Sequence, residues 1–340
     1  MSGRQSIKYI DANKGQLTAA AIALCFSAIA PVAQAGSINA NTATYAGDVS
    51  GLNFPAGTVA VSNYSAFRHG DTYYDTEGVA DRSGNLDVIT NVARIDWIVA
   101  TIYDMPFVLS AALPYGHLDN AELDGQDQSV QSSFFSPNVF VTLGVIVDPK
   151  NERTLGISNY FFFPIGNYDS VKAVNVATPN QTVVVPQFLY EEGLGKFSPA
   201  LKNFWIDVFG GAAFHSDGDN PLTIGGVGFD RTEQQHSYDI NVYLRYNWNP
   251  LTFVAIGIEK SWGGEQIGKG GALAALIGDT SLGKDEYVKG HLQCGFPLSE
   301  TFQISADLTH DFHREGGFEE DFTAEIRMST FILPASKPLK

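Results

Sequence analysis

Nine charged side chains lie within apolar stretches of this sequence, and their types and spacing suit them to handle a solute. Almost all have apolar residues on both sides, so an extended strand would turn the charges to one face and the apolar groups to the other. Both signs occur, which allows two interpretations: a pore lining that selects solutes, or ion pairs that fill a narrow interior. The predicted lumen-lining residues are Arg94, Asp96, Asp207, Asp239, Arg245, Glu259, Asp307, Glu325 and Arg327.

Other reactive side chains lack a specific arrangement. His310, Asp311 and His313 resemble metal ligands only loosely, and His310 falls on an apolar strand face near its end, as interfacial histidines do. There is no Gly-x-Ser-x-Gly elbow, His-Glu-x-x-His pair or phosphate loop, and His291 and Ser305 fit the polar lining. We therefore expect no catalytic residue, no metal and no cofactor; a barrel lipid hydrolase is the less favoured alternative.

Strands must position these charges, because apolar and polar residues alternate with a period of two. The segments from Tyr238 to Trp248 and from Phe302 to Phe312 separate the two kinds almost completely. Most segments have the length that a tilted strand needs to cross a bilayer. Twelve strands are predicted, at 57–67, 87–98, 105–114, 135–147, 153–164, 182–191, 203–214, 237–248, 251–262, 285–296, 300–312 and 321–332.

Connections of alternating length favour a membrane barrel over a soluble β-sandwich, whose strands would be shorter. Short turns occur at 148–152, Asn249-Pro250 and Leu298-Ser299. Long loops are predicted at 68–86, 115–134, 165–181, 215–236 and 263–284, with a shorter acidic loop at 313–320. The predicted fold is therefore all-β: a transmembrane antiparallel up-and-down β-barrel over residues 54–333, with both termini on the periplasmic side.

The N-terminal region predicts export. Three basic residues precede an Ala-rich apolar run that ends in Ala33-Gln34-Ala35, which is typical of a cleaved signal peptide over residues 1–35. The polar segment 36–53 is either a plug that enters the lumen or a loose periplasmic tail, and 334–340 forms a C-terminal tail. Cleavage would remove Cys25 and leave Cys294 without a disulfide partner.

The composition limits the partners. A net charge of −16 disfavours nucleic acid, while only 17% charged residues indicates that lipid covers part of the surface. The expected surroundings are outer-membrane lipid and lipopolysaccharide. An apolar stretch from Gly270 to Gly278 within a predicted external loop is either a capture surface for a hydrophobic ligand or a short helix that caps the barrel mouth.

Several short motifs resemble the outer-membrane transporter-like family of the meta-pathway of phenol degradation. They are Phe54-Pro55-Ala56-Gly57-Thr58, Tyr73-Tyr74-Asp75 with Gly78, Ala112-Leu113-Pro114-Tyr115-Gly116, and Phe163-Pro164-Ile165-Gly166-Asn167-Tyr168-Asp169. The resemblance covers most of the chain after the signal peptide. It implies a barrel and the passage of small hydrophobic or aromatic molecules by passive diffusion. The competing interpretation is a structural or adhesive outer-membrane barrel without transport.

Overall fold

The computed structural model describes residues 45–75, 78–148, 150–169, 172, 174–176, 181–219, 223–224, 227–249 and 252–334. The predicted signal peptide, residues 36–44 and most of the C-terminal tail therefore lie outside the described residues. Within these ranges no helix combines the length and the apolar character that a membrane-spanning helix needs.

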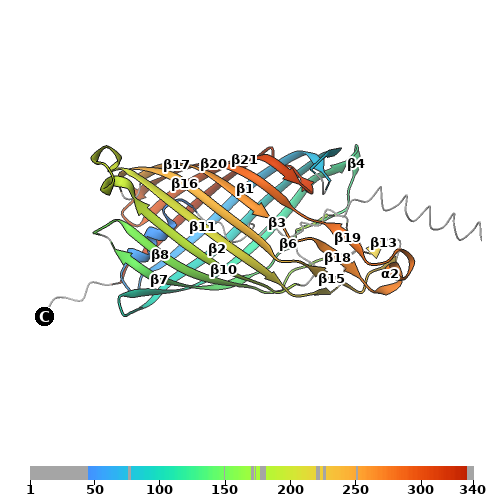
Figure 1. Ribbon diagram of the computed structural model, residues 1–340, viewed down its shortest axis with the longest axis horizontal. Coiled ribbons are helices and arrows are strands. Elements are labelled where there is room, and N and C mark those ends of the chain that lie inside the picture. Colours follow the sequence, from blue (N-terminus) through green and yellow to red (C-terminus); the bar gives the residue numbers. More distant parts are fainter. Residues whose placement is uncertain are drawn as a thin grey trace, which may run out of the picture.

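Twelve strands form one closed antiparallel barrel (Figure 1). Each strand pairs with the next along the chain, and the first pairs with the last to close the ring. The strands are β1 (Val59–Tyr74), β2 (Ala80–Ile102), β3 (Met105–Leu123), β7 (Asn138–Asp148), β8 (Arg153–Phe162), β10 (Val183–Gly193), β11 (Phe204–His215), β16 (Ser237–Asn249), β17 (Thr252–Trp262), β20 (Glu286–Ser299), β21 (Phe302–Glu315) and β23 (Phe322–Ile332).

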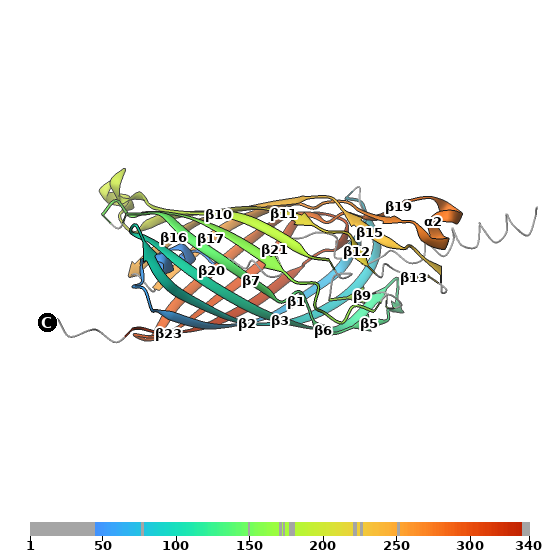
Figure 2. The ribbon, with the colours of Figure 1, turned by 90° about the horizontal axis from the view of Figure 1, so that it is seen from below.

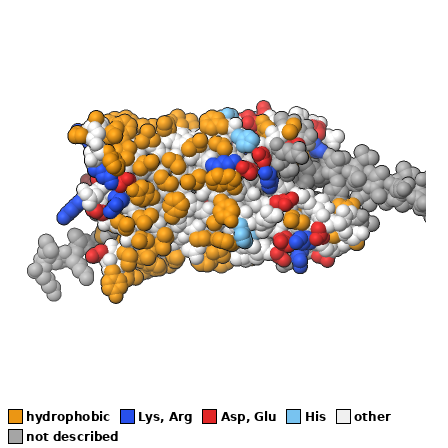
Figure 3. Space-filling model, in the orientation of Figure 1, with side chains coloured by type: hydrophobic (Ala, Val, Ile, Leu, Met, Phe, Trp, Pro, Cys, Tyr) orange, Lys and Arg blue, Asp and Glu red, His pale blue; other side chains and the backbone are white. Residues whose placement is uncertain are grey.

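The outer surface of this barrel is apolar. Every second residue of the strands projects outward, and Ile157, Ile256 and Leu292 remain half-exposed or more. On the face seen in Figure 3, hydrophobic side chains form a broad band over the barrel. Lipid has to cover such a surface, and closure of the sheet satisfies every strand's backbone groups within the hydrocarbon. The predicted fold class is confirmed.

The first three strands run further than predicted. Strand β1 continues to Tyr74, β2 begins at Ala80 and β3 continues to Leu123, so the predicted loops 68–86 and 115–134 are largely strand. Crossing a bilayer takes roughly ten residues, and these strands have 16, 23 and 19. Their far ends therefore project beyond the apolar band. Polar residues occupy both faces of these ends. The alternation that marks a membrane strand in the sequence is therefore absent there.

Two ends of the barrel are distinguished below. The turn end carries the short connections, including the 3-10 helices η3 (Leu194–Lys196) and η4 (Pro199–Leu201), and it holds the last described residues of the chain. The loop end carries the long connections, which contain the short strands β4 (Gln126–Asp127), β5 (Val130–Gln131), β6 (Ser133–Phe134), β9 (Val174–Asn175), β13 (Thr223–Ile224), β14 (Val227–Gly228) and β22 (Gly317–Phe318).

A small sheet extends from the loop end. It pairs β12 (Gly218–Asp219), β15 (Arg231–Gln234), β18 (Gln266–Lys269) and β19 (Thr280–Gly283), and the helix α2 (Gly271–Ile277) lies at its tip (Figure 1). Leu273 of the helix is buried against Phe229 and Leu282. The apolar stretch that begins at Gly270 therefore forms a helix with a small core of its own.

Residues 45–54, named the inward segment, lie inside the barrel at the turn end. They include the 3-10 helix η2 (Asp48–Asn53), which Figure 2 shows in blue, enclosed by the strands. Tyr45 and Ala46 are buried, and Leu52 packs in a cluster with Leu189 and Phe209 of the barrel wall. A chain segment thus fills part of the lumen.

Candidate functional site in the barrel lumen

The lumen contains a cavity of about 770 Å³. It extends from the middle of the barrel to the turn residues Asn249 and Ser299, and the inward segment forms one of its sides. The remaining lining combines polar and charged residues with aromatic side chains from different strands, among them Tyr64, Phe140, Tyr160, Trp205, Phe209 and Phe253. The cavity is therefore large enough for a small organic molecule, and it offers both aromatic surface and charged groups.

Stacked rings form one wall of the lumen. Phe140 and Tyr160, opposite each other on β7 and β8, have ring centroids 4.2 Å apart and nearly parallel planes, and Phe162 continues the stack. Fully buried Val185 and Ala213 complete this cluster. Phe140 and Tyr160 both line the cavity, so the stack gives the cavity an aromatic wall.

Arg94 and Asp96 border this aromatic wall on β2. The Arg94 Nε atom donates to Asp96 at 2.9 Å, and the Ser110 hydroxyl donates to the same carboxylate at 2.6 Å. The Arg94 guanidinium lies 4.7 Å from the centre of the Phe140 ring, within the range of a cation–π interaction. Both predicted residues face the cavity, and they are bound to each other.

Arg245 joins two acids across neighbouring strands. Its guanidinium lies 3.0 Å from Glu191 of β10 and 2.9 Å from Asp207 of β11, and all three side chains are almost completely buried. Gly47 of the inward segment packs on Arg245 with a φ of +87°, where a Cβ would lie only 3.0 Å from Arg245 Nη1. Glycine is therefore required at this contact.

A second buried network centres on His291. Its two ring nitrogens lie 3.0 Å from Glu259 and 2.9 Å from Asp307, and the Tyr287 hydroxyl donates to Glu259 at 2.6 Å. An imidazole that faces a carboxylate on each side satisfies both contacts only when both nitrogens carry protons. The cluster thus holds a positive ring between two negative charges, on the wall opposite the stacked rings.

Arg327 and Glu325 bind the inward segment. The Arg327 guanidinium pairs with Asp48, and its centre lies 4.2 Å from the centre of the Tyr45 ring. The Tyr45 hydroxyl donates to Glu325 at 2.8 Å. Together with Arg245, these two residues show that part of the predicted set contacts the chain's own N-terminal region, which the sequence pattern did not indicate.

Asp239 completes the set of nine. It is buried on β16, where the Asn241 side-chain amide donates to it at 3.1 Å, and no cation within the described ranges pairs with it. All nine predicted side chains therefore turn inward, but they form separate groups: Arg94 with Asp96, Arg245 with Asp207, Glu259 with Asp307 through a histidine, and Glu325 and Arg327 on the inward segment.

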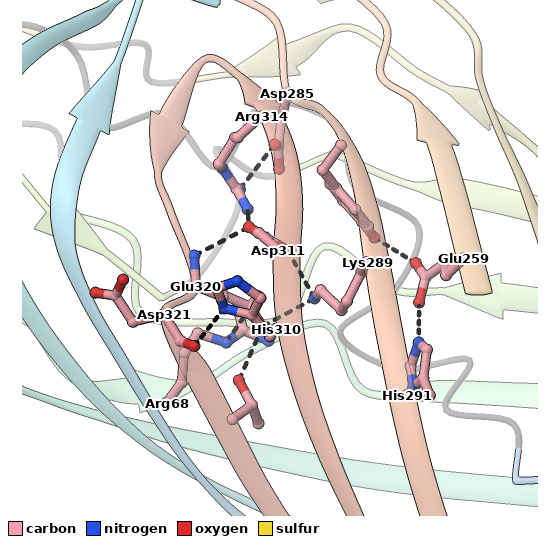
Figure 4. Close-up of polar contacts among 12 residues, drawn as sticks. Arg68, Glu259, Asp285, Lys289, His291, His310, Asp311, Arg314, Glu320 and Asp321 are labelled. Carbon is pink, nitrogen blue, oxygen red and sulfur yellow. Dashed lines mark hydrogen bonds and ion pairs between the residues drawn. The ribbon is translucent and has the colours of Figure 1, made fainter. Parts of the chain in front are cut away.

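A further charged cluster at the loop end was missed in the sequence (Figure 4). Glu320 lies 3.0 Å from Arg68 and 2.8 Å from Lys289, and Arg314 donates to both Asp311 and Asp285 at 2.7 Å. The predicted loops contained Arg68 and Glu320, so the alternation rule did not apply to them. Two of its members did lie on polar faces of predicted strands: Lys289 shares a face with His291, and Asp311 shares one with Asp307.

Burial and neighbouring charges have opposite effects on the pKa values of the acids in this cluster. Burial disfavours the ionised form of Glu320, but Arg68, Lys289 and Arg314 together hold the pKa of that carboxyl well below its usual range. Burial raises the pKa of Asp285 to about 6, because Arg314 offsets the loss of water only in part. Glu320 is therefore a fixed negative charge, whereas Asp285 titrates close to neutral pH.

Residues of the long connection between β8 and β10 fold into the loop end of the barrel. Val174 and Val176 are buried against Leu118, Phe135 and Phe318, in a cluster that includes residues of β1, β2 and β3. The mouth is thus narrowed by apolar side chains in addition to the ionic cluster.

The loosely spaced metal candidates separate in the structure. His310 is exposed on the outer face with Nδ1 2.6 Å from the Asp321 backbone oxygen, while Asp311 turns inward to Arg314 (Figure 4). Across the described ranges, no three His, Cys, Asp or Glu side chains are grouped so as to hold a metal ion. Cys294 is a free thiol on the outer face.

The fold is similar to that of solved outer-membrane barrels. A crystal structure of an outer membrane channel from Pseudomonas putida F1 superposes with a TM-score of 0.71 at 21% identity, covering 85% of this chain and all of the other. A mutant of TodX, a monoaromatic hydrocarbon channel, gives a TM-score of 0.46 at 9% identity over 82% of this chain and 89% of the other. No family model and no curated protein matches the sequence, so the resemblance to the meta-pathway family stays a prediction.

Proposed function

We propose that this protein is an outer-membrane channel through which small hydrophobic or aromatic solutes diffuse passively. The observation that carries the proposal is the lumenal cavity with its stack of aromatic rings, inside a closed barrel whose exterior is apolar. A structural barrel has no need of such a space, since paired charges and close-packed side chains would fill it. The resemblance to the meta-pathway family supports the same class of solute.

The described state is closed in this proposal. The inward segment occupies the lumen at the turn end, and Val174 and Val176 narrow the loop end. Passage then requires displacement of the inward segment, which is held by side-chain contacts and a short 3-10 helix and pairs with no barrel strand. The nine charged residues shape the lumen and hold this segment, and none is assigned a catalytic role.

A comparison of two proteins tests the proposal: the secreted chain, beginning at Gly36, and the same chain lacking residues 36–53. Each is refolded and inserted in planar bilayers, and the uptake of radiolabelled toluene into liposomes is measured in parallel. We expect rare openings for the longer protein, frequent openings for the shorter one, and toluene uptake that rises with the openings. Silent bilayers and uptake equal to that of empty liposomes, for both proteins, would overturn the proposal in favour of a structural barrel.

A further inference from the structure

Arg327 differs from the other two arginines that line the cavity because its acidic partner does not belong to a barrel strand. Arg94 takes the carboxylate of Asp96, and Arg245 takes those of Glu191 and Asp207, all from barrel strands. The acid on Arg327 is Asp48, which belongs to the inward segment. If the inward segment leaves the lumen, Arg327 is the arginine of these three that loses its ion pair.

Arg327 also keeps an unused donor. Its Nη1 atom pairs with Asp48 and its Nη2 atom donates to Ser305, but its Nε atom finds no hydrogen-bond partner among the described residues. The side chain is only 9% exposed. A guanidinium has five N–H donors arranged to bind both oxygens of a carboxylate, so this one can bind an acid more completely than it does here.

The inward segment presents a ring and a carboxylate to Arg327 together. The Tyr45 backbone N–H donates to Asp48 Oδ2 at 3.0 Å, which keeps the two residues adjacent. The Tyr45 ring lies against the guanidinium and 6.2 Å from the Tyr64 ring, while Asp48 takes Nη1. The inward segment thus brings an aromatic ring and a carboxylate to the same arginine. An aromatic carboxylate would bring the same two groups.

We propose that the lumen around Arg327 and Tyr64 is a binding site for aromatic carboxylates, and that residues Tyr45 and Asp48 occupy it as an internal competitor. The inference rests on the channel function proposed above and names its preferred solute and its opening signal. A neutral aromatic molecule that displaced the inward segment would leave the Arg327 guanidinium without its carboxylate partner. An aromatic carboxylate supplies a ring and a carboxylate to Arg327 in their place and so favours the open state.

The charges of the cavity agree with an anionic ligand. Four basic side chains line it, Arg94, Lys202, Arg245 and Arg327. Acids of the barrel strands pair with Arg94 and Arg245, whereas the acid on Arg327 is Asp48. Departure of the inward segment removes Asp48 from this set. The open cavity is therefore more positive than the closed one, at the position where the incoming carboxylate would lie.

Three related probes test the inference on the secreted chain in planar bilayers. Phenylpropionate carries a ring and a carboxylate, phenylpropanol carries the ring alone, and butyrate carries the carboxylate alone. At about ten times its dissociation constant, a ligand that binds only the open state raises the ratio of open to closed channels roughly tenfold. We expect this rise with phenylpropionate and less than a twofold change with the other two.

Two variants assign the effect to the proposed contacts. Asp48→Asn weakens the internal competitor without altering a barrel strand, so the basal open probability should rise and less phenylpropionate should be needed for the same opening. Arg327→Gln should open more often without ligand and lose the response to phenylpropionate. Asp217→Asn and Arg231→Gln are matched controls, since they break an exposed pair at the loop end and should behave as the wild type.

Direct binding provides a test that does not need a bilayer recording. Equilibrium dialysis of phenylpropionate should show tighter binding to the chain that lacks residues 36–53 than to the secreted chain. Equal responses to all three probes, or an unchanged response in Arg327→Gln, would overturn the inference. If the truncated protein takes up toluene but binds no phenylpropionate, the inference falls and the channel function survives; loss of uptake as well would remove both.

Discussion

Replacement of Leu52 by alanine should open the channel through lost packing alone. Leu52 is 7% exposed and packs with Leu189, Phe209 and Tyr243 inside the barrel. A leucine truncated to alanine in a packed core costs about 2 to 5 kcal/mol. That cost applies to the closed state, because the side chain is in water once the inward segment has left. Taking roughly 2 kcal/mol, the ratio of open to closed channels should rise about 30-fold.

Single-channel recording measures this ratio directly as open probability. Leu109→Ala is the matched control, because it removes the same atoms from a half-exposed side chain on the lipid face and should leave gating unchanged. Both proteins should show the same heat-modifiable migration as the wild type, which establishes that the barrel is intact. An open probability for Leu52→Ala within twofold of the wild type would refute the idea that packing of the inward segment keeps the channel closed.

Three further predictions concern the barrel itself. Arg245→Gln leaves two buried acids without a cation and should destabilise the barrel by about 3 to 5 kcal/mol in urea unfolding, while Arg231→Gln should have little effect. The pKa of Asp285 is raised to about 6, so its neutral form is favoured in the folded mouth; the midpoint of thermal unfolding should rise as pH falls from about 7.5 to about 5, and Asp285→Asn should abolish this rise. Ile256 is 60% exposed on the lipid face, so Ile256→Arg should cost roughly 2 to 4 kcal/mol in the same urea assay, while Ile256→Leu should be neutral.

The barrel could be predicted from the sequence because its two faces meet opposite environments. In the segment from Tyr238 to Trp248, every outward residue contacts lipid and every inward residue contacts the polar lumen, so the alternation is nearly complete. All twelve predicted segments overlap a strand of the structure. Their ends are less accurate, since a strand that leaves the membrane no longer needs an apolar face.

The contacts within the lumen could not be predicted in the same way. Arg327 meets Asp48, a residue 279 positions earlier, only because the inward segment folds back into the closed barrel. Arg68 and Lys289 reach Glu320 through the registers of three strands, and a shift by one residue would turn those charges outward. Alternation indicates which residues face inward, but the pairs depend on register and on how the loops fold.

The distribution of these contacts suggests how one barrel can be rigid and still admit a solute. The ionic networks of Arg245 and His291 lie on β10 to β21, where removal of one partner would leave a buried charge, whereas β7 and β8 carry stacked rings. A solute that moves along the aromatic wall of β7 and β8 therefore breaks no ion pair of these networks. The inward segment is anchored at Arg327 on the ionic side and packs through Leu52 toward the middle of the barrel, so its release depends on two separable interactions. A neutral solute can replace only the packing of Leu52, because it has no carboxylate to offer Arg327. We therefore expect the charge of a solute to govern opening and the shape of its ring to govern passage.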